Sequence, residues 1–190
     1  MNYMNYDRQK QPTKMDQNAT TNIDQDVAKS RNLKYQNSQQ EVKQYIYDTL
    51  KPKFPTLLQS KYGSGDSIDL KSVELMEMLK DGEVLCRLGS LLTIPTNPTI
   101  KFKNSKIPFI QMENISFFLT LCELIDLPHD EIFQTVDLFE SKDPYQVVVT
   151  LMSFSRIANS IDSDSFPKVI GPKTVKIKPP VPVKPFKLRS

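Results

Sequence analysis

The sequence predicts an all-α fold, and three observations lead to that prediction. Apolar residues recur at helical spacing in several separate stretches of the 190-residue chain. No segment alternates apolar and polar residues with the period of two that a half-buried strand needs. Prolines and glycines separate the helical stretches, at positions where they would end helices. We therefore expect a compact bundle of four main helices plus short ones.

The first helix is expected to begin near Ser38. Ser38 and Glu41 have the spacing of a capping box, and an apolar stripe follows over residues 42–50. Pro52 and Pro55 would then end this helix.

The residues before this helix are predicted to be a disordered polar arm. Residues 1–36 are rich in Asn, Gln, Asp, Lys and Thr and show no helical period. So few apolar side chains cannot offset the entropy lost on ordering. The expected organisation is therefore an arm at 1–36, a helical domain at 37–162 and a tail at 163–190.

The middle of the domain is predicted to hold two helical pieces that meet at Asp81–Gly82. One apolar stripe runs over residues 73–79 and the next over residues 84–91. Gly82 can adopt a positive φ to close the first piece, and Asp81 can cap the second. An irregular, proline-containing connection is expected over residues 93–108.

The clearest helical pattern covers residues 110–125, with apolar side chains on one face at Ile115, Phe118, Leu119, Cys122 and Ile125. A short helix is expected from Pro128 toward Phe133. Asp143 followed by Pro144 is the signature of a helix start, and the last amphipathic helix should reach about Ser160.

The C-terminal residues differ in kind from the domain. From Ser165 onward the chain has six prolines and no acidic residue, so we expect an extended, partly polyproline II tail. The rest of the chain carries a net charge of −4 against +7 for this tail. The basic residues of the tail are Lys168, Lys173, Lys176, Lys178, Lys184, Lys187 and Arg189.

Composition and residue types argue against an enzyme, a metal site or a bound cofactor. The single histidine, His129, is expected at an exposed helix start, and Cys86 and Cys122 are expected to be buried thiols. These residues cannot supply a metal cluster or a Cys–His pair. No apolar run is long enough to span a membrane, and the N-terminus lacks a secretory h-region. We expect a cytoplasmic protein with no nucleic-acid partner.

Three stretches resemble the calponin homology domain of the transgelin/calponin family. They are DGEVLCRL at 81–88, SKIPFIQMENISFFL at 105–119 and FQTVDLFESKDPYQVVVTLMSFSR at 133–156. The resemblance covers about residues 38–160, and the layout with a basic tail is similar to that of the small fungal members of the family. It implies a single calponin homology domain.

Two features depart from the family pattern. Tyr45 stands where the first helix of the family has a core tryptophan, and Phe139 stands where many members have another. The C-terminal calponin-like repeat is also missing, so an actin contact made by that repeat would be lacking here.

The resemblance implies a protein that binds actin filaments and cross-links or stabilises them at cortical actin structures. Because filamentous actin is acidic, the seven basic residues of the tail are the expected contact. Lys101, Lys103 and Lys106, in the connection before the central helix, are a possible second contact.

The tail also permits a different function. Pro179, Pro180, Pro182 and Pro185 lie in two overlapping motifs of the kind that polyproline-binding domains recognise beside a basic residue. The alternative hypothesis is therefore an adaptor that recruits signalling or endocytic partners through its tail.

Overall fold

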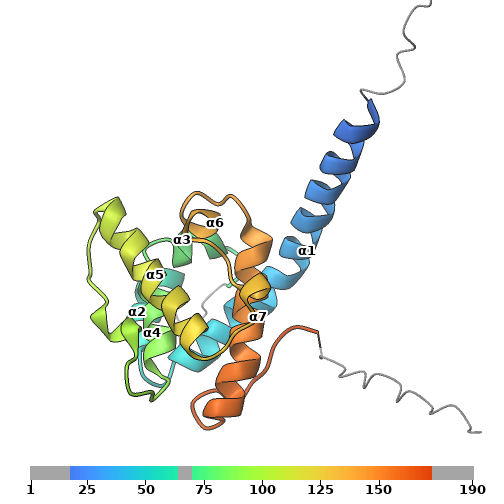
Figure 1. Cartoon of the computed structure of the whole chain (residues 1–190). Coiled ribbons are helices and arrows are strands. Elements are labelled where there is room, and N and C mark those ends of the chain that lie inside the picture. Colours follow the sequence, from blue (N-terminus) through green and yellow to red (C-terminus); the bar gives the residue numbers. More distant parts are fainter. Residues whose placement is uncertain (1–17, 64–69, 173–190) are drawn as a thin grey trace, which may run out of the picture.

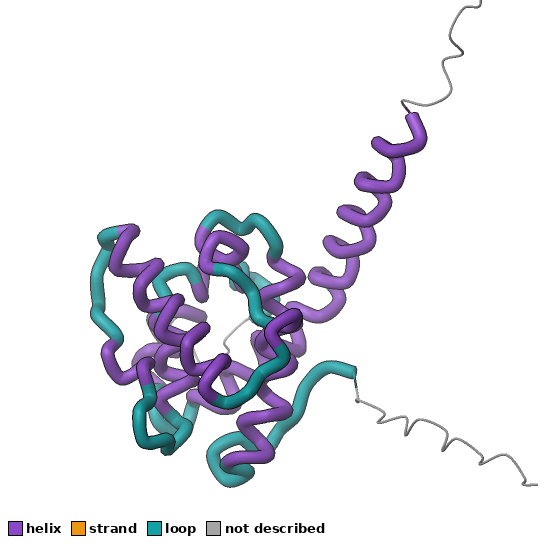
Figure 2. Tube along the Cα trace, in the orientation of Figure 1, coloured by secondary structure: helices purple, strands orange, loops and turns teal. Residues whose placement is uncertain are grey.

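A computed structural model describes residues 18–63 and 70–172, and every regular element in these ranges is helical (Figure 2). The all-α prediction is therefore confirmed. The elements are α1 (Asn18–Leu50), α2 (Pro55–Tyr62), α3 (Leu75–Leu79), α4 (Glu83–Ser90), η1 (Pro98–Lys101), α5 (Pro108–Leu124), η2 (His129–Glu131), α6 (Thr135–Phe139) and α7 (Pro144–Ile161).

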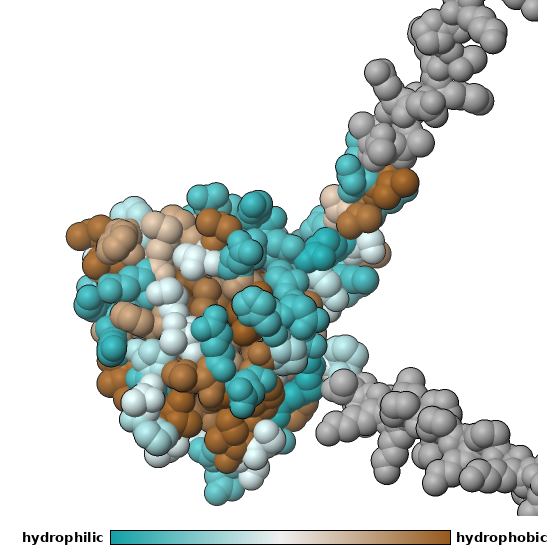
Figure 3. Space-filling model, in the orientation of Figure 1, coloured by the Kyte–Doolittle hydropathy of each residue, from teal (hydrophilic) through white to brown (hydrophobic). Residues whose placement is uncertain are grey.

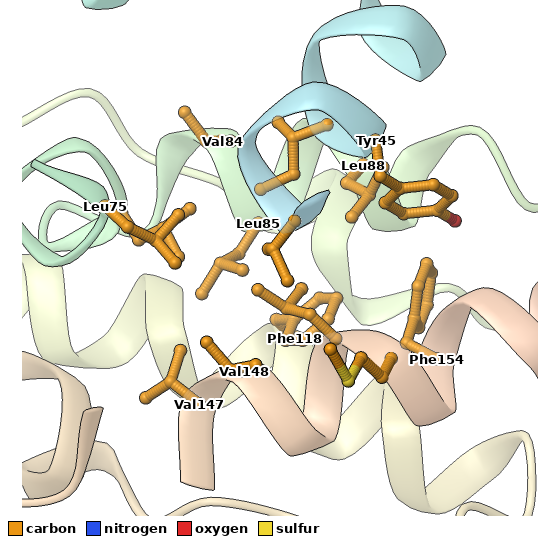
Figure 4. Packing of buried hydrophobic residues seen from close by; sticks show 14 of the residues in the cluster. Tyr45, Leu75, Val84, Leu85, Leu88, Phe118, Val147, Val148 and Phe154 are labelled. Carbon is orange, nitrogen blue, oxygen red and sulfur yellow. The ribbon is translucent and has the colours of Figure 1, made fainter. Parts of the chain in front are cut away.

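The long helices surround one hydrophobic core. The C-terminal half of α1 packs along α7, while α4 packs along α5 and η1 (Figure 1). Phe118 of α5 and Phe154 of α7 meet at the centre, with ring centroids 5.2 Å apart. The apolar stripes predicted from the sequence point into this core (Figure 4).

Tyr45 takes the place of the tryptophan expected at this position of the first helix, and it is fully buried beside Phe154 (Figure 4). Its hydroxyl has no hydrogen-bond partner among the described residues. Burial of the side chain raises the pKa of Tyr45 above its usual value, and the nearby Thr49 side chain opposes part of this rise. Phe139, at the other expected tryptophan position, is half-buried, with the Lys80 amine 5.7 Å from its ring centroid.

The junction predicted at Asp81–Gly82 forms as expected. Gly82 has a φ of 74°, and an added Cβ would lie 2.6 Å from the Cβ of Asn114. Only glycine fits this position without moving α5. Gly82 is the N-cap of α4, and the carboxylate of the preceding Asp81 accepts a hydrogen bond from the Glu83 N–H in the first turn.

The prediction for the first helix is wrong about where it begins. α1 starts at Asn18, and Ser38 and Glu41 lie inside it instead of forming a capping box. Residues 18–36 are therefore helical, against the predicted disorder, whereas residues 1–17 lie outside the described residues. The Tyr35 side chain is buried and its hydroxyl donates to Glu74, so contacts distant in sequence extend the helix.

The predicted boundary at 162/163 also needs correction. The chain turns after α7 and runs back along the domain, drawn in red in Figure 1. Phe166 and Ile170 are buried in the core. The packed domain therefore extends to Gly171. We call residues 166–171 the strap.

Candidate functional site

The strap fixes the point at which the basic tail leaves the domain. The Phe166 ring packs edge-on against Phe154, with centroids 5.7 Å apart. The Asn159 side-chain amide donates to the Phe166 carbonyl over 2.7 Å, and the Ile170 N–H donates to Ser155 Oγ over 3.1 Å. The first part of the predicted tail is thus a structural element of the domain.

Gly171 ends the strap in a conformation that suits glycine. Its φ is 84°, and an added Cβ would lie 2.7 Å from the Met152 sulfur. Its N–H donates to the Glu41 carboxylate over 3.4 Å. The chain beyond Pro172 therefore starts from a defined place beside α1 and α7.

Of the seven basic tail residues predicted as the contact, Lys168 is the one that lies within the described ranges. Its Nζ forms an ion pair with Asp48 of α1 at 2.6 Å, although the side chain stays exposed. Part of its charge is therefore used within the domain. The other predicted basic residues lie outside the described residues: Lys173, Lys176, Lys178, Lys184, Lys187 and Arg189. The prolines of the polyproline motifs, Pro179, Pro180, Pro182 and Pro185, lie there too.

Of the lysines of the second predicted contact, Lys101 is the last residue of η1, and Lys103 and Lys106 lie on the connection between η1 and α5. Lys101 and Lys106 are exposed, whereas Lys103 forms an ion pair with Glu113 at 3.0 Å. The buried Asn114 side chain holds this connection, because it accepts from the Lys103 N–H and donates to the Lys103 and Asp81 carbonyls. The connection is therefore rigidly attached to α4 and α5.

Three exposed apolar residues accompany these lysines, and the sequence reasoning missed them. Ile100, Ile107 and Phe109 are 74%, 60% and 70% exposed. We call residues 100–109 the basic-apolar connection. Phe109 lies inside one of the family-like stretches, yet helical spacing alone could not show that it points outward.

The strap and the basic-apolar connection lie on opposite sides of the domain in Figure 1. Lys168 of the strap contacts α1, and Lys103 of the connection contacts α5. Among the described residues, Lys168 therefore does not lie beside Lys101, Lys103 and Lys106 in one site.

Nucleophilic chemistry has little support in the described residues. Burial raises the pKa of the Cys86 thiol to about 12, and it raises that of Cys122 as well. His129 is exposed at the start of η2. No group of three His, Cys, Asp or Glu residues in the described ranges is placed to hold a metal ion. Nor is any helix described there long and apolar enough to span a bilayer.

Comparison with known proteins agrees with the fold. The sequence model of the calponin homology (CH) domain family matches residues 58–160 of this chain. Transgelin of Saccharomyces cerevisiae is 40% identical over 177 residues, which cover 90% of this chain and 80% of that protein. Transgelin of Schizosaccharomyces pombe is 36% identical over 57% of this chain and 61% of its own length.

A relative from an animal shows the same similarity over a shorter span. Myophilin of Echinococcus granulosus is 42% identical over 97 residues, about half of each chain. These matches place the chain among structural proteins rather than enzymes. The chain belongs to the calponin homology domain proteins of the transgelin family.

Proposed function

We propose that this protein binds actin filaments and cross-links or stabilises them in the cortical cytoplasm, with the basic tail as its main contact. Family membership supports actin as the partner. The observation that carries the tail assignment is its charge, since residues 165–190 hold seven basic residues and no acidic one. Such a segment is attracted to an acidic filament over about one Debye length, ~8 Å at physiological salt.

The strap gives this contact a fixed origin. Because Phe166 and Ile170 are buried, the residues after Pro172 leave the domain from one place and not from a long loose linker. A fixed origin raises the effective concentration of the tail near a filament that the domain also touches.

The basic-apolar connection is the proposed second contact. Lys101 and Lys106 supply charge, and Ile107 and Phe109 supply apolar area beside it. A tail that starts from the strap and a contact on the opposite side of the domain can each reach a different filament, so a single molecule can act as a cross-link.

Co-sedimentation with filaments tests the tail contact. The chain should be cut after Pro172, because a cut at Asp164 would also remove the buried Phe166 and Ile170. The chain ending at Pro172 keeps the packed domain and loses six of the seven basic residues. We expect salt-sensitive pelleting of the full chain and an affinity loss of at least about tenfold after the cut.

A full-length variant separates charge from chain length. Replacing the basic residues of the tail beyond Pro172 by glutamine should reproduce the loss caused by the cut. Equal pelleting of this variant and the natural chain would refute the tail contact. Absence of pelleting by the natural chain at low salt would refute the actin assignment itself.

The same assay separates the polyproline motifs of the adaptor hypothesis from filament binding. Pro179→Ala combined with Pro182→Ala removes both polyproline motifs and keeps every charge of the tail. Capture of a polyproline-binding domain, which this double variant should lose, tests the adaptor hypothesis itself. We expect this double variant to pellet with filaments like the natural chain. A loss of pelleting as large as that of the glutamine variant would show that tail conformation, and not charge, makes the contact.

A further inference from the structure

A hollow between α2 and α4 borders the basic-apolar connection. Its volume is about 480 Å³, within the range of about 300–1,000 Å³ for natural ligand clefts. Asn104 of the connection lines it, and Phe102 of the connection lies beside Arg87 of α4, with 5.1 Å between the guanidinium carbon and the ring centroid. The hollow and the connection are therefore parts of one surface. We use the name α2–α4 hollow for the site lined by Lys53, Phe54, Ser60, Glu83, Arg87 and Asn104.

The connection gives this surface an apolar edge. Figure 1 shows the connection, drawn in light green, running along the side of the domain to the start of α5, and Figure 3 shows apolar side chains gathered at that end of α5, at the upper left. Ile107 and Phe109, on either side of Pro108 at the start of α5, are 60% and 70% exposed. An apolar edge of this kind excludes water from charged contacts formed next to it.

Arg87 is the side chain of the hollow whose hydrogen-bonding capacity is unused. Its guanidinium carbon lies 5.5 Å from the centroid of the Phe54 ring and 5.1 Å from that of Phe102, which are cation–π distances. Its nitrogen lies 3.7 Å from the Glu83 carboxylate, beyond the ~3.2 Å limit of an N–H···O hydrogen bond. Within the described ranges the guanidinium donates no hydrogen bond. Two rings therefore restrict where the guanidinium lies, while its donors stay available.

The charges of the hollow match a single carboxylate. Lys53 and Arg87 are two cations and Glu83 is one anion, so the lining carries a net charge of +1. The planar guanidinium can donate two parallel hydrogen bonds to a carboxylate, whose one negative charge balances the lining. A phosphate monoester, with a charge of about −1.5 to −2, would exceed it.

We propose that the α2–α4 hollow binds the carboxylate of an acidic side chain on the filament, with Arg87 as the residue that recognises it. This inference rests on the proposed second contact and adds a specific receptor to it. The lysines of the connection attract the acidic filament, Ile107 and Phe109 cover the apolar edge of the contact, and Arg87 holds the carboxylate. Arg87 therefore determines which acidic site on the filament the domain accepts.

Filament bundling by the full-length chain tests the proposal. Low-speed centrifugation pellets only bundled filaments, whereas high-speed centrifugation pellets all filaments with the protein bound to them. Arg87→Gln and Arg87→Lys should each raise the concentration for half-maximal bundling about tenfold, the loss expected for a hydrogen bond between charged groups. Lysine keeps the charge but cannot make two parallel hydrogen bonds. High-speed pelleting should fall less, because these variants keep the basic tail.

Lys80→Gln is the matched control for the loss of charge. Lys80 also lies beside an aromatic ring, with its amine 5.7 Å from the Phe139 centroid, and it also pairs with a nearby glutamate, Glu77, at 3.6 Å. It does not line the hollow. Lys80→Gln should therefore leave the concentration for half-maximal bundling unchanged.

A second variant tests the hollow without touching the packing of Arg87. Asn104→Asp adds a negative charge at the exposed rim and should raise the concentration for half-maximal bundling about two- to fivefold. Asn32→Asp makes the same change at an exposed site on α1 and should have no effect. Cooperative unfolding of every variant establishes that its domain is folded.

Three results would overturn this inference while the tail contact stands. The first is bundling by Arg87→Lys at the same concentration as the natural chain, since charge alone would then suffice. The second is unchanged or stronger bundling by Asn104→Asp. The third is a natural chain that pellets with filaments at high speed but forms no bundles. A natural chain that does not pellet even at high speed in low salt would instead remove the actin assignment, and this inference with it.

Discussion

The two ends of the described domain contrast in secondary structure and in burial. The projecting part of α1 is a regular helix, yet its side chains from Ile23 to Ser30 are exposed. The strap has no regular structure, yet it buries Phe166 and Ile170 (Figure 2). Helical geometry therefore does not measure how firmly a segment belongs to the domain. Burial of large apolar side chains is the better guide, because it supplies most of the folding free energy.

The largest expected effect is on the strap. Phe166→Ala should lower the free energy of unfolding by about 3–5 kcal/mol, because it opens a cavity beside Phe154. Urea denaturation followed by circular dichroism measures the change. Val169→Ala is the matched control, since this strap residue is half exposed and should alter stability by less than about 0.5 kcal/mol. Equal effects of the two variants would show that the strap is only a surface segment.

The next effect concerns the point where α1 joins the domain. Tyr35→Phe should cost about 1–2 kcal/mol, because it leaves Glu74 without its hydrogen bond from the Tyr35 hydroxyl. Tyr45→Phe on the same helix should cost nothing or stabilise slightly, since the Tyr45 hydroxyl has no partner among the described residues. Paired urea titrations compare the two. A larger loss of unfolding free energy for Tyr45→Phe than for Tyr35→Phe would contradict these two hydrogen-bond assignments.

A smaller effect is expected from the ion pair that joins the strap to α1. Lys168→Gln should cost at most about 1 kcal/mol, because the lysine is exposed and water screens its attraction to Asp48. Adding salt should lower the stability of the natural chain toward that of the variant. A difference that persists at high salt would mean that Lys168 stabilises the strap through packing.

The smallest effect is expected from the projecting arm. Deleting the residues before Ser30 should change the free energy of unfolding by less than about 0.5 kcal/mol. Hydrogen exchange gives a second measurement. Amides of α1 before Ser30 should exchange far faster than the Ile170 amide, which donates to Ser155. Slower amide exchange in α1 before Ser30 than at Ile170 would contradict the conclusion that the strap is held more firmly to the domain than the arm.

The candidate contacts were only partly predictable from the sequence. Lys101, Lys103 and Lys106 were predicted as a contact from their charge alone. All three are exposed, and Lys103 forms an ion pair with Glu113. The apolar residues beside them were missed, because a residue at the start of a helix can point inward or outward with the same local pattern. The role of Lys168 was also missed, since Asp48 lies 120 residues away in the sequence.

The sequence by itself determined the helical class, the family and the local signals at Asp81–Gly82 and Asp143–Pro144. These signals act within about four residues, the reach of a cap or one helical turn, so the chain shows them without knowledge of the fold. The Asp143 carboxylate accepts from the Gln146 N–H as such a cap requires.

Only the tertiary structure decided where the domain begins and ends. α1 belongs to the domain from about Arg31 onward because Arg31 and Tyr35 find partners at Asp143 and Glu74, which lie 112 and 39 residues away. The strap joins the core because Phe154 offers a surface for Phe166. Composition indicated disorder for one segment and an extended tail for the other. Composition counts apolar side chains within a segment, whereas burial depends on the partners that the fold brings to it.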